Sequence, residues 1–330
     1  MKQSKICRLT IAIVLMMMSA VWTPASLFGA DLPRARIGVL TPGLSLGPVR
    51  EGMEEGLAHL GFVKGRNATF IVDDTKGITK DLVPRVEQLL SAKLDVLFAV
   101  STDHAQAAKR ATSAVPIVFA WVGDPVRAGL IEGYAHSKSN LTGVSAIGDS
   151  LSGKRLEVLL EIAPKAKRLL VIVSAQESVS VSAIRSLQIA AQKFGVQLVR
   201  RDATDRGEVI KALETTPRGS IDAIFHVPST LVRTHLDLLV NRAGKDRIPL
   251  AVHEETLLDR GALFSYGPNT RLVGLQTAKI VHRILKGTWP GEIMIENPDR
   301  FFLAINQTTA KQIGVNVPRG MLEQADRLIP

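Results

Sequence analysis

Short apolar segments alternate with longer amphipathic ones along this chain, and this alternation constrains the fold more than any other feature. We predict strands at residues 36–40, 68–72, 96–100 and 117–120, and helices at about residues 49–60, 82–92 and 104–113. Parallel strands require crossover connections, which are usually helices. The pattern therefore predicts an α/β fold with parallel sheets that helices cover on both faces.

Three landmarks of the first half of the chain return in the second half in the same order. They lie at residues 60–62, 95–98 and 115–118, and again at residues 194–196, 222–225 and 248–251. Glycine at helix ends and proline at strand starts are common in α/β chains, so a generic similarity is the alternative. The shared order favours two similar lobes, and 330 residues also exceed one ordinary core.

The first thirty residues have the layout of a secretory signal peptide. Basic residues precede an apolar run from Ile11 to Met18, and small residues after it offer cleavage sites at Ala25 or Ala30. A buried N-terminal helix is the alternative, but no polar face interrupts the run. The run is too short to span a bilayer of roughly 30 Å. We expect residues 1–30 to be removed and the mature protein to be periplasmic.

The only cysteine, Cys7, lies inside this leader and before its apolar run. A lipoprotein signal needs a cysteine after the run, so we expect no lipid anchor. The mature chain then also has no disulfide and no thiol chemistry.

The chain is basic, but its charge is dispersed. The formal net charge of +10 falls to +7 when the three basic residues of the leader are removed. The densest cluster, Lys165, Lys167 and Arg168, has no interleaved aromatic residues. We therefore expect no nucleic-acid partner, and no second apolar stretch reaches membrane length.

Enzymatic chemistry has no support in the sequence. The motifs of zinc proteases, serine hydrolases and P-loop nucleotide-binding proteins are missing, and the seven histidines lack metal-ligand spacing. The acid pairs Asp73–Asp74 and Glu254–Glu255 would point to opposite faces of a strand, so neither forms an acid/base dyad by adjacency. We expect no nucleophile–base pair, no catalytic residue, no metal and no cofactor.

Polar residues gather where predicted strands end, which is where ligands bind to open parallel sheets. Helix N-termini at these positions favour anions, although the same residue types also cap helices. The candidate ligand-binding residues are Thr41, Ser45, Ser101, Thr102, Asp103, Trp121, Gly123, Asp124, Ser174, Glu177, Ser229, Thr230, Glu254 and Tyr266.

Two aromatic residues among these candidates suggest a ring-shaped ligand. Trp121 follows a predicted strand and Tyr266 lies near the predicted hinge, so the two could sandwich a ring. The alternative is that Tyr266 wedges the hinge and Trp121 packs under a loop.

The charged and hydroxyl candidates suggest an amino acid. Asp103 or Glu254 would bind an ammonium group, while Ser101, Ser229 and backbone amides would bind a carboxylate.

Segments throughout the chain are similar to one family, the periplasmic solute-binding proteins of ABC importers that include tryptophan-type binding proteins. The matching segments are residues 56–62, 115–120, 122–126, 141–145, 265–268, 284–287, 304–311 and 314–315. The combination of Val-Gly-Asp-Pro at 122–125 with Ser-Tyr-Gly-Pro at 265–268 is the most specific of these. The sequence departs from the family at Ser101-Thr102-Asp103, where a small Gly-Thr type turn is commoner, so tryptophan is not inherited as the ligand.

The resemblance implies two Rossmann-like lobes of the type I periplasmic binding class, joined by a hinge of several strands. On this basis the N-terminal lobe comprises residues 31–146 and about 268–298, and the C-terminal lobe comprises residues 147–267 and about 299–330. The implied protein is a monomer that captures a small solute and delivers it to an ABC permease and its ATPase.

Three other functions compete with solute import. A sensory receptor of the same fold would report a ligand to a membrane signalling partner. An exported two-lobed enzyme would need a nucleophile–base pair in the cleft. A sugar-responsive repressor would need an N-terminal DNA-binding helix pair, but the expected signal peptide occupies that position in this sequence.

Overall fold

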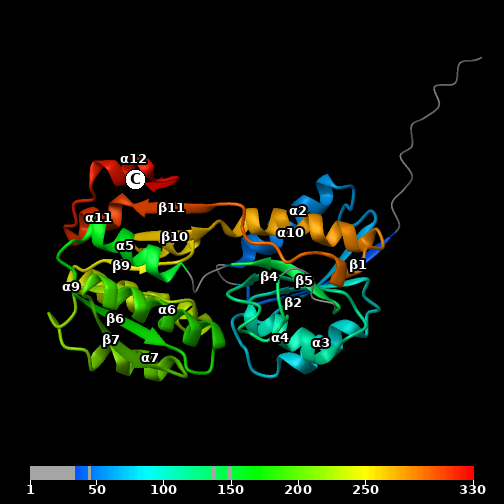
Figure 1. The fold of residues 1–330 in the computed structure, drawn as a ribbon, viewed down its shortest axis with the longest axis horizontal. Coiled ribbons are helices and arrows are strands. Elements are labelled where there is room, and N and C mark those ends of the chain that lie inside the picture. Colours follow the sequence, from blue (N-terminus) through cyan, green and yellow to red (C-terminus); the bar gives the residue numbers. More distant parts are fainter. Residues whose placement is uncertain (1–33, 44–45, 135–138, 147–150) are drawn as a thin grey trace, which may run out of the picture. The chain divides into compact units, whose positions relative to one another are not determined.

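The computed structural model describes residues 34–43, 46–134, 139–146 and 151–330. The expected signal peptide and the candidate Ser45 lie outside this part of the chain. Two sheets organise the described residues, and each is built mainly from parallel strands (Figure 1).

The first sheet has five strands in the order β2-β1-β3-β4-β5, all parallel. They are β1 (Ala35–Thr41), β2 (Ala68–Asp74), β3 (Val96–Val100), β4 (Ile117–Val122) and β5 (Leu141–Ser145). Every residue of β3, β4 and β5 is buried, as expected for strands that helices cover on both faces. The helices of this sheet are α2 (Gly47–His59), α3 (Leu82–Leu90) and α4 (Thr102–Ala111), joined by α10 (Thr270–Leu285) from far along the chain.

Helix α10 packs directly against α2, and the two lie side by side in Figure 1. Glycine makes this close approach possible. A Cβ atom on Gly52 would lie 2.2 Å from the carbonyl oxygen of Arg271, and one on Gly274 would lie 2.1 Å from that of Val49. No other residue fits at either position without moving a backbone, so the two glycines fix α10 on the first sheet.

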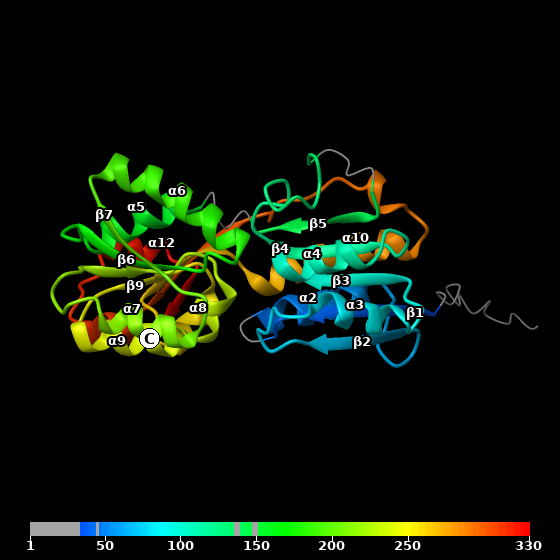
Figure 2. The same cartoon turned by 90° about the horizontal axis from the view of Figure 1, so that it is seen from below.

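The second sheet has seven strands in the order β12-β11-β10-β9-β8-β6-β7. They are β6 (Arg168–Val173), β7 (Gln197–Asp202), β8 (Ala223–Phe225), β9 (Leu250–Val252), β10 (Phe264–Pro268), β11 (Phe301–Asn306) and β12 (Arg327–Ile329). Its helices are α5 (Ser152–Ile162), α6 (Ser178–Phe194), α7 (Arg206–Glu214), α8 (Thr230–Thr234), α9 (Leu236–Asp246), α11 (Gln307–Ile313) and α12 (Arg319–Gln324). Figure 2 shows them on both faces of this sheet.

The α/β class with parallel sheets is confirmed, and one pair of strands in the second sheet is an antiparallel exception. Strand β11 runs antiparallel to β10, with Phe264 opposite Ile305 and Pro268 opposite Phe301. After β10 the chain forms α10 against the first sheet and the short 3₁₀ turn η3 (Pro290–Glu292), and then returns from that side. A strand that returns in this way meets its neighbour in the opposite direction.

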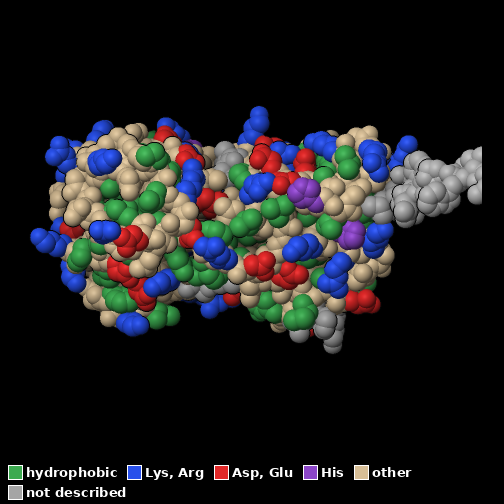
Figure 3. All heavy atoms as spheres, turned by 90° about the horizontal axis from the view of Figure 1, so that it is seen from above, with side chains coloured by type: hydrophobic (Ala, Val, Ile, Leu, Met, Phe, Trp, Pro, Cys, Tyr) green, Lys and Arg blue, Asp and Glu red, His purple; other side chains and the backbone are tan. Residues whose placement is uncertain are grey.

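Two apolar clusters fill the two faces of the second sheet. One lies under α5 and α6, and includes Leu156, Leu187 and Phe225. The other lies under α7 and α9, and includes Leu213 and Leu239. Within the described residues, no helix combines the length and the apolar character that crossing a membrane requires. On the face that carries α10 and β11, basic and acidic side chains are intermixed (Figure 3).

Candidate functional site

The carboxyl ends of strands from both sheets line one cavity. Its free volume is about 30 Å³, room for about two water molecules, so the two sides must move apart to admit a larger ligand. One side, which we call the Ser101 wall, follows β3, β4 and β5 and consists of Ser101, Thr102, Asp103, Trp121, Gly123 and Ala146. The other side, the Arg233 wall, consists of Val179, Pro228, Ser229, Thr230, Arg233 and His253.

Two residues of the Ser101 wall have left-handed backbones. Ser101 has a φ of 87° between β3 and α4, and Trp121 has a φ of 60°. Such conformations are costly for residues other than glycine and concentrate at functional sites. At Trp121 the pairing of β4 with β5 shifts, which is a β-bulge. Trp121 therefore lies within the strand, not after it as predicted, and the bulge gives its buried side chain a place on the cavity.

Ser101 and His104 form a nucleophile–base pair that the sequence analysis did not expect. The Ser101 Oγ lies 2.8 Å from His104 Nδ1, and His104 Nε2 lies 3.0 Å from Thr75 Oγ1. Burial and, to a smaller extent, the nearby positive charge of Arg233 together lower the pKa of His104 to about 3. An imidazole with so low a pKa, whose second nitrogen contacts a hydroxyl and no carboxylate, is a weak general base. The contact with His104 instead orients the Ser101 hydroxyl.

Asp103 brings a negative charge to the Ser101 wall at the start of α4. Burial and, to a smaller extent, the carboxylate of Glu177 raise the pKa of Asp103, which is about 6. The positive charges of Arg233 and Arg110 act in the opposite direction. The carboxyl group is therefore only weakly held in its charged form, and a cationic group in the cavity would stabilise that form.

The hydroxyl and acid groups near α8 serve mainly to cap this short helix. The Ser229 Oγ accepts from the backbone N–H of Val232 at 3.1 Å. The two carboxylate oxygens of Glu177 accept from the N–H groups of Thr230 and Leu231 at 2.7 and 2.8 Å. The alternative noted for such residues, helix capping, thus applies to Ser229 and Glu177.

Arg233 is the charged group of the Arg233 wall, and sequence reasoning missed it. Its side chain is 4% exposed, and its Nη1 donates to Glu254 Oε1 at 3.2 Å. His253 Nε2 also lies 2.9 Å from Glu254 Oε1. Arg233 lies one helical turn after Ser229, so its position on the same helix face was the available signal.

Behind this wall lies a second buried arginine. Arg155 is completely buried, and its Nε donates to the carbonyl oxygen of Tyr266 at 3.2 Å. Its guanidinium lies 5.7 Å from the ring centre of Phe225. Burial lowers its pKa to about 9, against the opposing effect of the Glu254 carboxylate.

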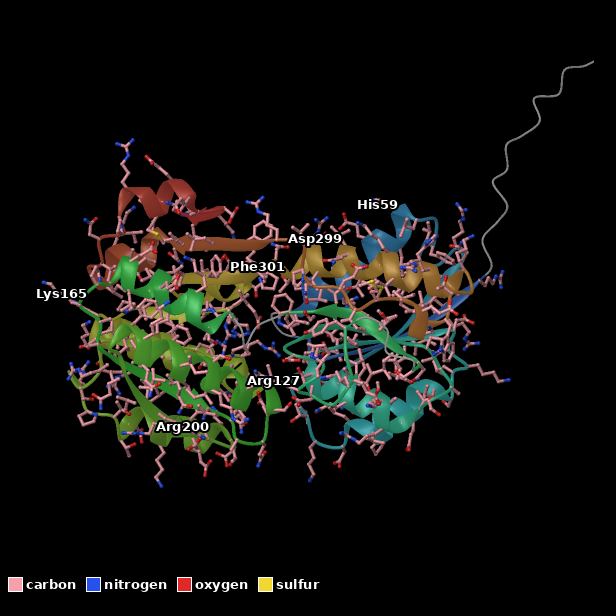
Figure 4. All side chains as sticks on the ribbon, viewed as in Figure 1. His59, Arg127, Lys165, Arg200, Asp299 and Phe301 are labelled. Atoms are coloured by element: carbon pink, nitrogen blue, oxygen red, sulfur yellow. The ribbon has the colours of Figure 1, made fainter. Side chains whose placement is uncertain are left out.

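The assignment of an ammonium site to Glu254 has no support in the structure, since its carboxylate is fully buried against Arg233 and His253. The Trp121–Tyr266 sandwich is likewise not formed. Tyr266 packs against the core under α5, with its ring 6.3 Å from that of Phe301, and does not line the cavity. Phe301 is labelled in Figure 4 at the start of β11.

Other candidates lie close to the cavity without lining it. The Thr41 Oγ1 accepts from Gly43 N–H at 3.2 Å and shapes a turn. The Asp124 Oδ1 accepts from the N–H groups of Val126 and Arg127 at 3.0 and 3.1 Å. Ser174 and Glu177 line an adjoining, more polar hollow that shares Asp103 with the cavity.

A side-chain contact also joins the two sides near the cavity. The Nη1 of Arg127, which is labelled in Figure 4, donates to Ser182 Oγ on α6 at 3.0 Å. Across the part of the chain that the structure describes, no group of three or more acidic, histidine or cysteine side chains is arranged to hold a metal ion.

A family model described as "ABC transporter substrate binding protein" matches residues 37–329. A curated relative, a tyrosine-binding protein from Clostridioides difficile (strain R20291), is 28% identical over 270 residues, which are 82% of this chain and 77% of that protein.

Solved structures give the same picture of the fold. A conserved domain protein from Vibrio cholerae has a TM-score of 0.84 and 29% identity, over 89% of this chain and 99% of that one. An ABC domain in complex with L-Trp, from Streptococcus pneumonia, has a TM-score of 0.84 and 22% identity, over 90% of this chain and 100% of that one. The ligand-free, open structure of a substrate-binding protein with adhesive properties, from Clostridium difficile, has a TM-score of 0.66 and 27% identity, over 89% of this chain and 98% of that one.

Proposed function

The chain belongs to the ABC transporter substrate-binding protein family, and from this premise we propose that it captures an amino acid or a similar small aromatic solute for import. The observation that carries the proposal is the cavity between the Ser101 wall and the Arg233 wall. It offers an acid, an arginine, hydroxyl groups and an indole ring to one small ligand. Such a mixture of a few polar groups with apolar surface suits orientation and specific binding.

Relatives support an aromatic amino acid as the first ligand to test. One relative is named for tyrosine binding, and one structure of the same fold contains L-Trp. Trp121 would supply apolar area for a ring, since its side chain lines the cavity. We propose that the solute leaves unchanged, since an imidazole with a pKa of about 3 is a weak base for activating Ser101.

We further propose that the two sheets are the cores of two lobes that close over the ligand. The N-terminal lobe takes residues 31–146 and about 268–298, and the C-terminal lobe takes residues 147–267 and about 299–330. The packing of α10 on α2 and the pairing of β11 with β10 support these limits. A ligand that contacts both walls would favour the closed state by its differential affinity.

We propose that the protein acts in the periplasm as a monomer, after residues 1–30 have been removed as a signal peptide. It delivers the solute to an ABC permease that a cytoplasmic ATPase drives. Deletion of the genes that encode such a permease would abolish uptake of the ligand and leave its binding unchanged. Continued uptake would favour the sensory receptor.

Thermal denaturation with L-tyrosine and L-tryptophan tests the binding proposal. A ligand at one hundred times its Kd stabilises the folded state by about 2.7 kcal/mol, so a clear rise in Tm is expected. Small-angle scattering should show compaction at the same concentrations. If no amino acid or small aromatic acid raises the Tm, the proposal fails.

A pair of variants locates the ring of the ligand. Trp121→Leu should weaken binding about two- to tenfold, the contribution of aromatic contacts. Tyr266→Leu should leave the affinity unchanged because this ring lies outside the cavity. The reverse result would restore Tyr266 to the site.

A further inference from the structure

Two residues of the Arg233 wall each contain a buried polar atom that has no hydrogen-bond partner in the protein. The Nε of Arg233 and the Nδ1 of His253 are both buried and make no hydrogen bond, and both residues line the cavity. Buried polar groups are nearly always paired, and each unpaired one costs free energy. A ligand that pairs them would remove this cost.

The two atoms differ in hydrogen-bonding type. An arginine Nε always carries a proton and can only donate. His253 is held neutral because burial lowers its pKa, and its Nε2 faces the Glu254 carboxylate at 2.9 Å. The ring proton therefore belongs on Nε2, and Nδ1 is left as an acceptor. The wall offers one donor and one acceptor.

The charges around these atoms have a definite pattern. Two buried guanidinium groups, those of Arg233 and Arg155, face one fully buried carboxylate, that of Glu254. Both terminal nitrogens of Arg155 also lack a partner. Arg233 and Arg155 thus both interact electrostatically with the Glu254 carboxylate, and an anionic group of the ligand would give Arg233 a second partner of opposite charge. Across the cavity, Asp103 supplies a negative charge.

We propose that the cavity recognises the zwitterionic head of an α-amino acid, with its carboxylate on Arg233 Nε and its ammonium group shared between His253 Nδ1 and Asp103. This assignment rests on the proposed solute-binding function and deepens it. It replaces the sequence-based assignment of the carboxylate to Ser101 and Ser229, whose hydroxyls contact His104 and the α8 backbone.

Calorimetric titration with three probes that share one ring tests the assignment: L-tyrosine, tyramine and 3-(4-hydroxyphenyl)propionate. Tyramine lacks the carboxylate, and the propionate lacks the ammonium group. We expect L-tyrosine to bind at least about tenfold more tightly than either, since each loss leaves a buried group unpaired. Equal binding of either analogue would overturn the assignment and leave the solute-binding function intact.

Matched variants assign each half of the head group. The double variant Arg233→Gln with Glu254→Gln keeps a neutral pair and should abolish discrimination against tyramine. His253→Phe should reduce discrimination against the propionate. The controls are Arg242→Met, an arginine paired with Asp246 away from the cavity, and His226→Phe, whose ring lies 5.0 Å from that of His253 but does not line the cavity. Both controls should retain the selectivity of the unchanged protein. Selectivity that survives in both site variants would overturn the assignment.

If none of the three probes binds, the same comparison is made among the twenty common L-amino acids, with the amine and the deaminated acid of each. Selectivity for a non-aromatic amino acid supports the zwitterion site and rejects the aromatic ligand. Binding only of compounds without an amino-acid head rejects the zwitterion site alone. Binding of nothing rejects both.

Discussion

The Ser101 wall and the Arg233 wall hold their polar groups in different ways. The Ser101 wall depends on backbone shape, with left-handed residues at Ser101 and Trp121 and a neutral His104 behind. The Arg233 wall depends on charge, with Arg233 and His253 both held by Glu254. Strain and ion pairing are alternative ways to fix a side chain before a ligand arrives, and they respond differently to mutation and to pH.

The largest effect should come from breaking the ion pair of the Arg233 wall. Arg233→Met leaves the Glu254 carboxylate buried and poorly compensated, so the free energy of unfolding should fall by about 3–5 kcal/mol. Adding Glu254→Gln should recover a large part of this loss. Urea denaturation of the single and the double variant measures both the loss of unfolding free energy and its recovery. A single variant as stable as the unchanged protein would mean that charge does not hold this wall.

A smaller effect, with two opposite trends, is expected at Asp103. Its pKa is raised to about 6, so the folded state binds the proton more tightly than the unfolded state does. Between pH 8 and 6 the buried, charged Asp103 carboxylate therefore lowers the free energy of unfolding. This destabilisation is lost as the carboxylate is protonated and the pH falls toward 4. Asp103→Asn should stabilise the protein at pH 8 by about 1–2 kcal/mol, allowing for solvent screening, and should not do so at pH 4.

The affinity for a ligand with an ammonium group should depend on pH in the opposite sense. Lower pH removes the destabilising effect of Asp103 but should weaken ligand binding. An ammonium group needs the charged carboxylate, so the affinity for L-tyrosine should fall as the pH drops through about 6. In Asp103→Asn this dependence should disappear. Titrations at several pH values in both proteins check it, and an unchanged pH profile in the variant would remove Asp103 from the site.

The smallest effect concerns the strain at Ser101. Ser101→Gly relieves a left-handed backbone but loses the contact with His104, so its stability should change by no more than about 1 kcal/mol. Ser101→Ala keeps the strain and loses the same contact, so it should be the less stable of the two. At Ser145 in β5, whose φ is not positive, the order should reverse. Thermal denaturation of the four variants decides this.

Local pattern was sufficient to predict most of the Ser101 wall. Residues 101–103 and 121–123 follow or end strands whose apolar runs are unmistakable, and such ends meet at one edge of a parallel sheet. The same reasoning selected Ser229 and Thr230, which line the cavity. It failed where a side chain's direction depends on a distant partner.

His253 and Glu254 show most clearly what the sequence alone cannot predict about the site. They are neighbours after β9, and the sequence does not say which one faces the ligand. In the structure His253 lines the cavity, whereas Glu254 is buried behind it against Arg233, which is 21 residues away. Arg233 itself was missed because an arginine on a short helix is usually exposed.

The sequence by itself determined the order of strands and helices, because apolar periodicity is a local property of the chain. It also predicted a binding site at the carboxyl ends of the strands, where the structure has a cavity. Only the tertiary structure decided that β11 runs antiparallel to β10, that Tyr266 leaves the cavity, and that Glu254 neutralises Arg233. These outcomes depend on contacts between residues far apart in the chain, whose pairing follows from burial and charge in three dimensions and not from spacing along it.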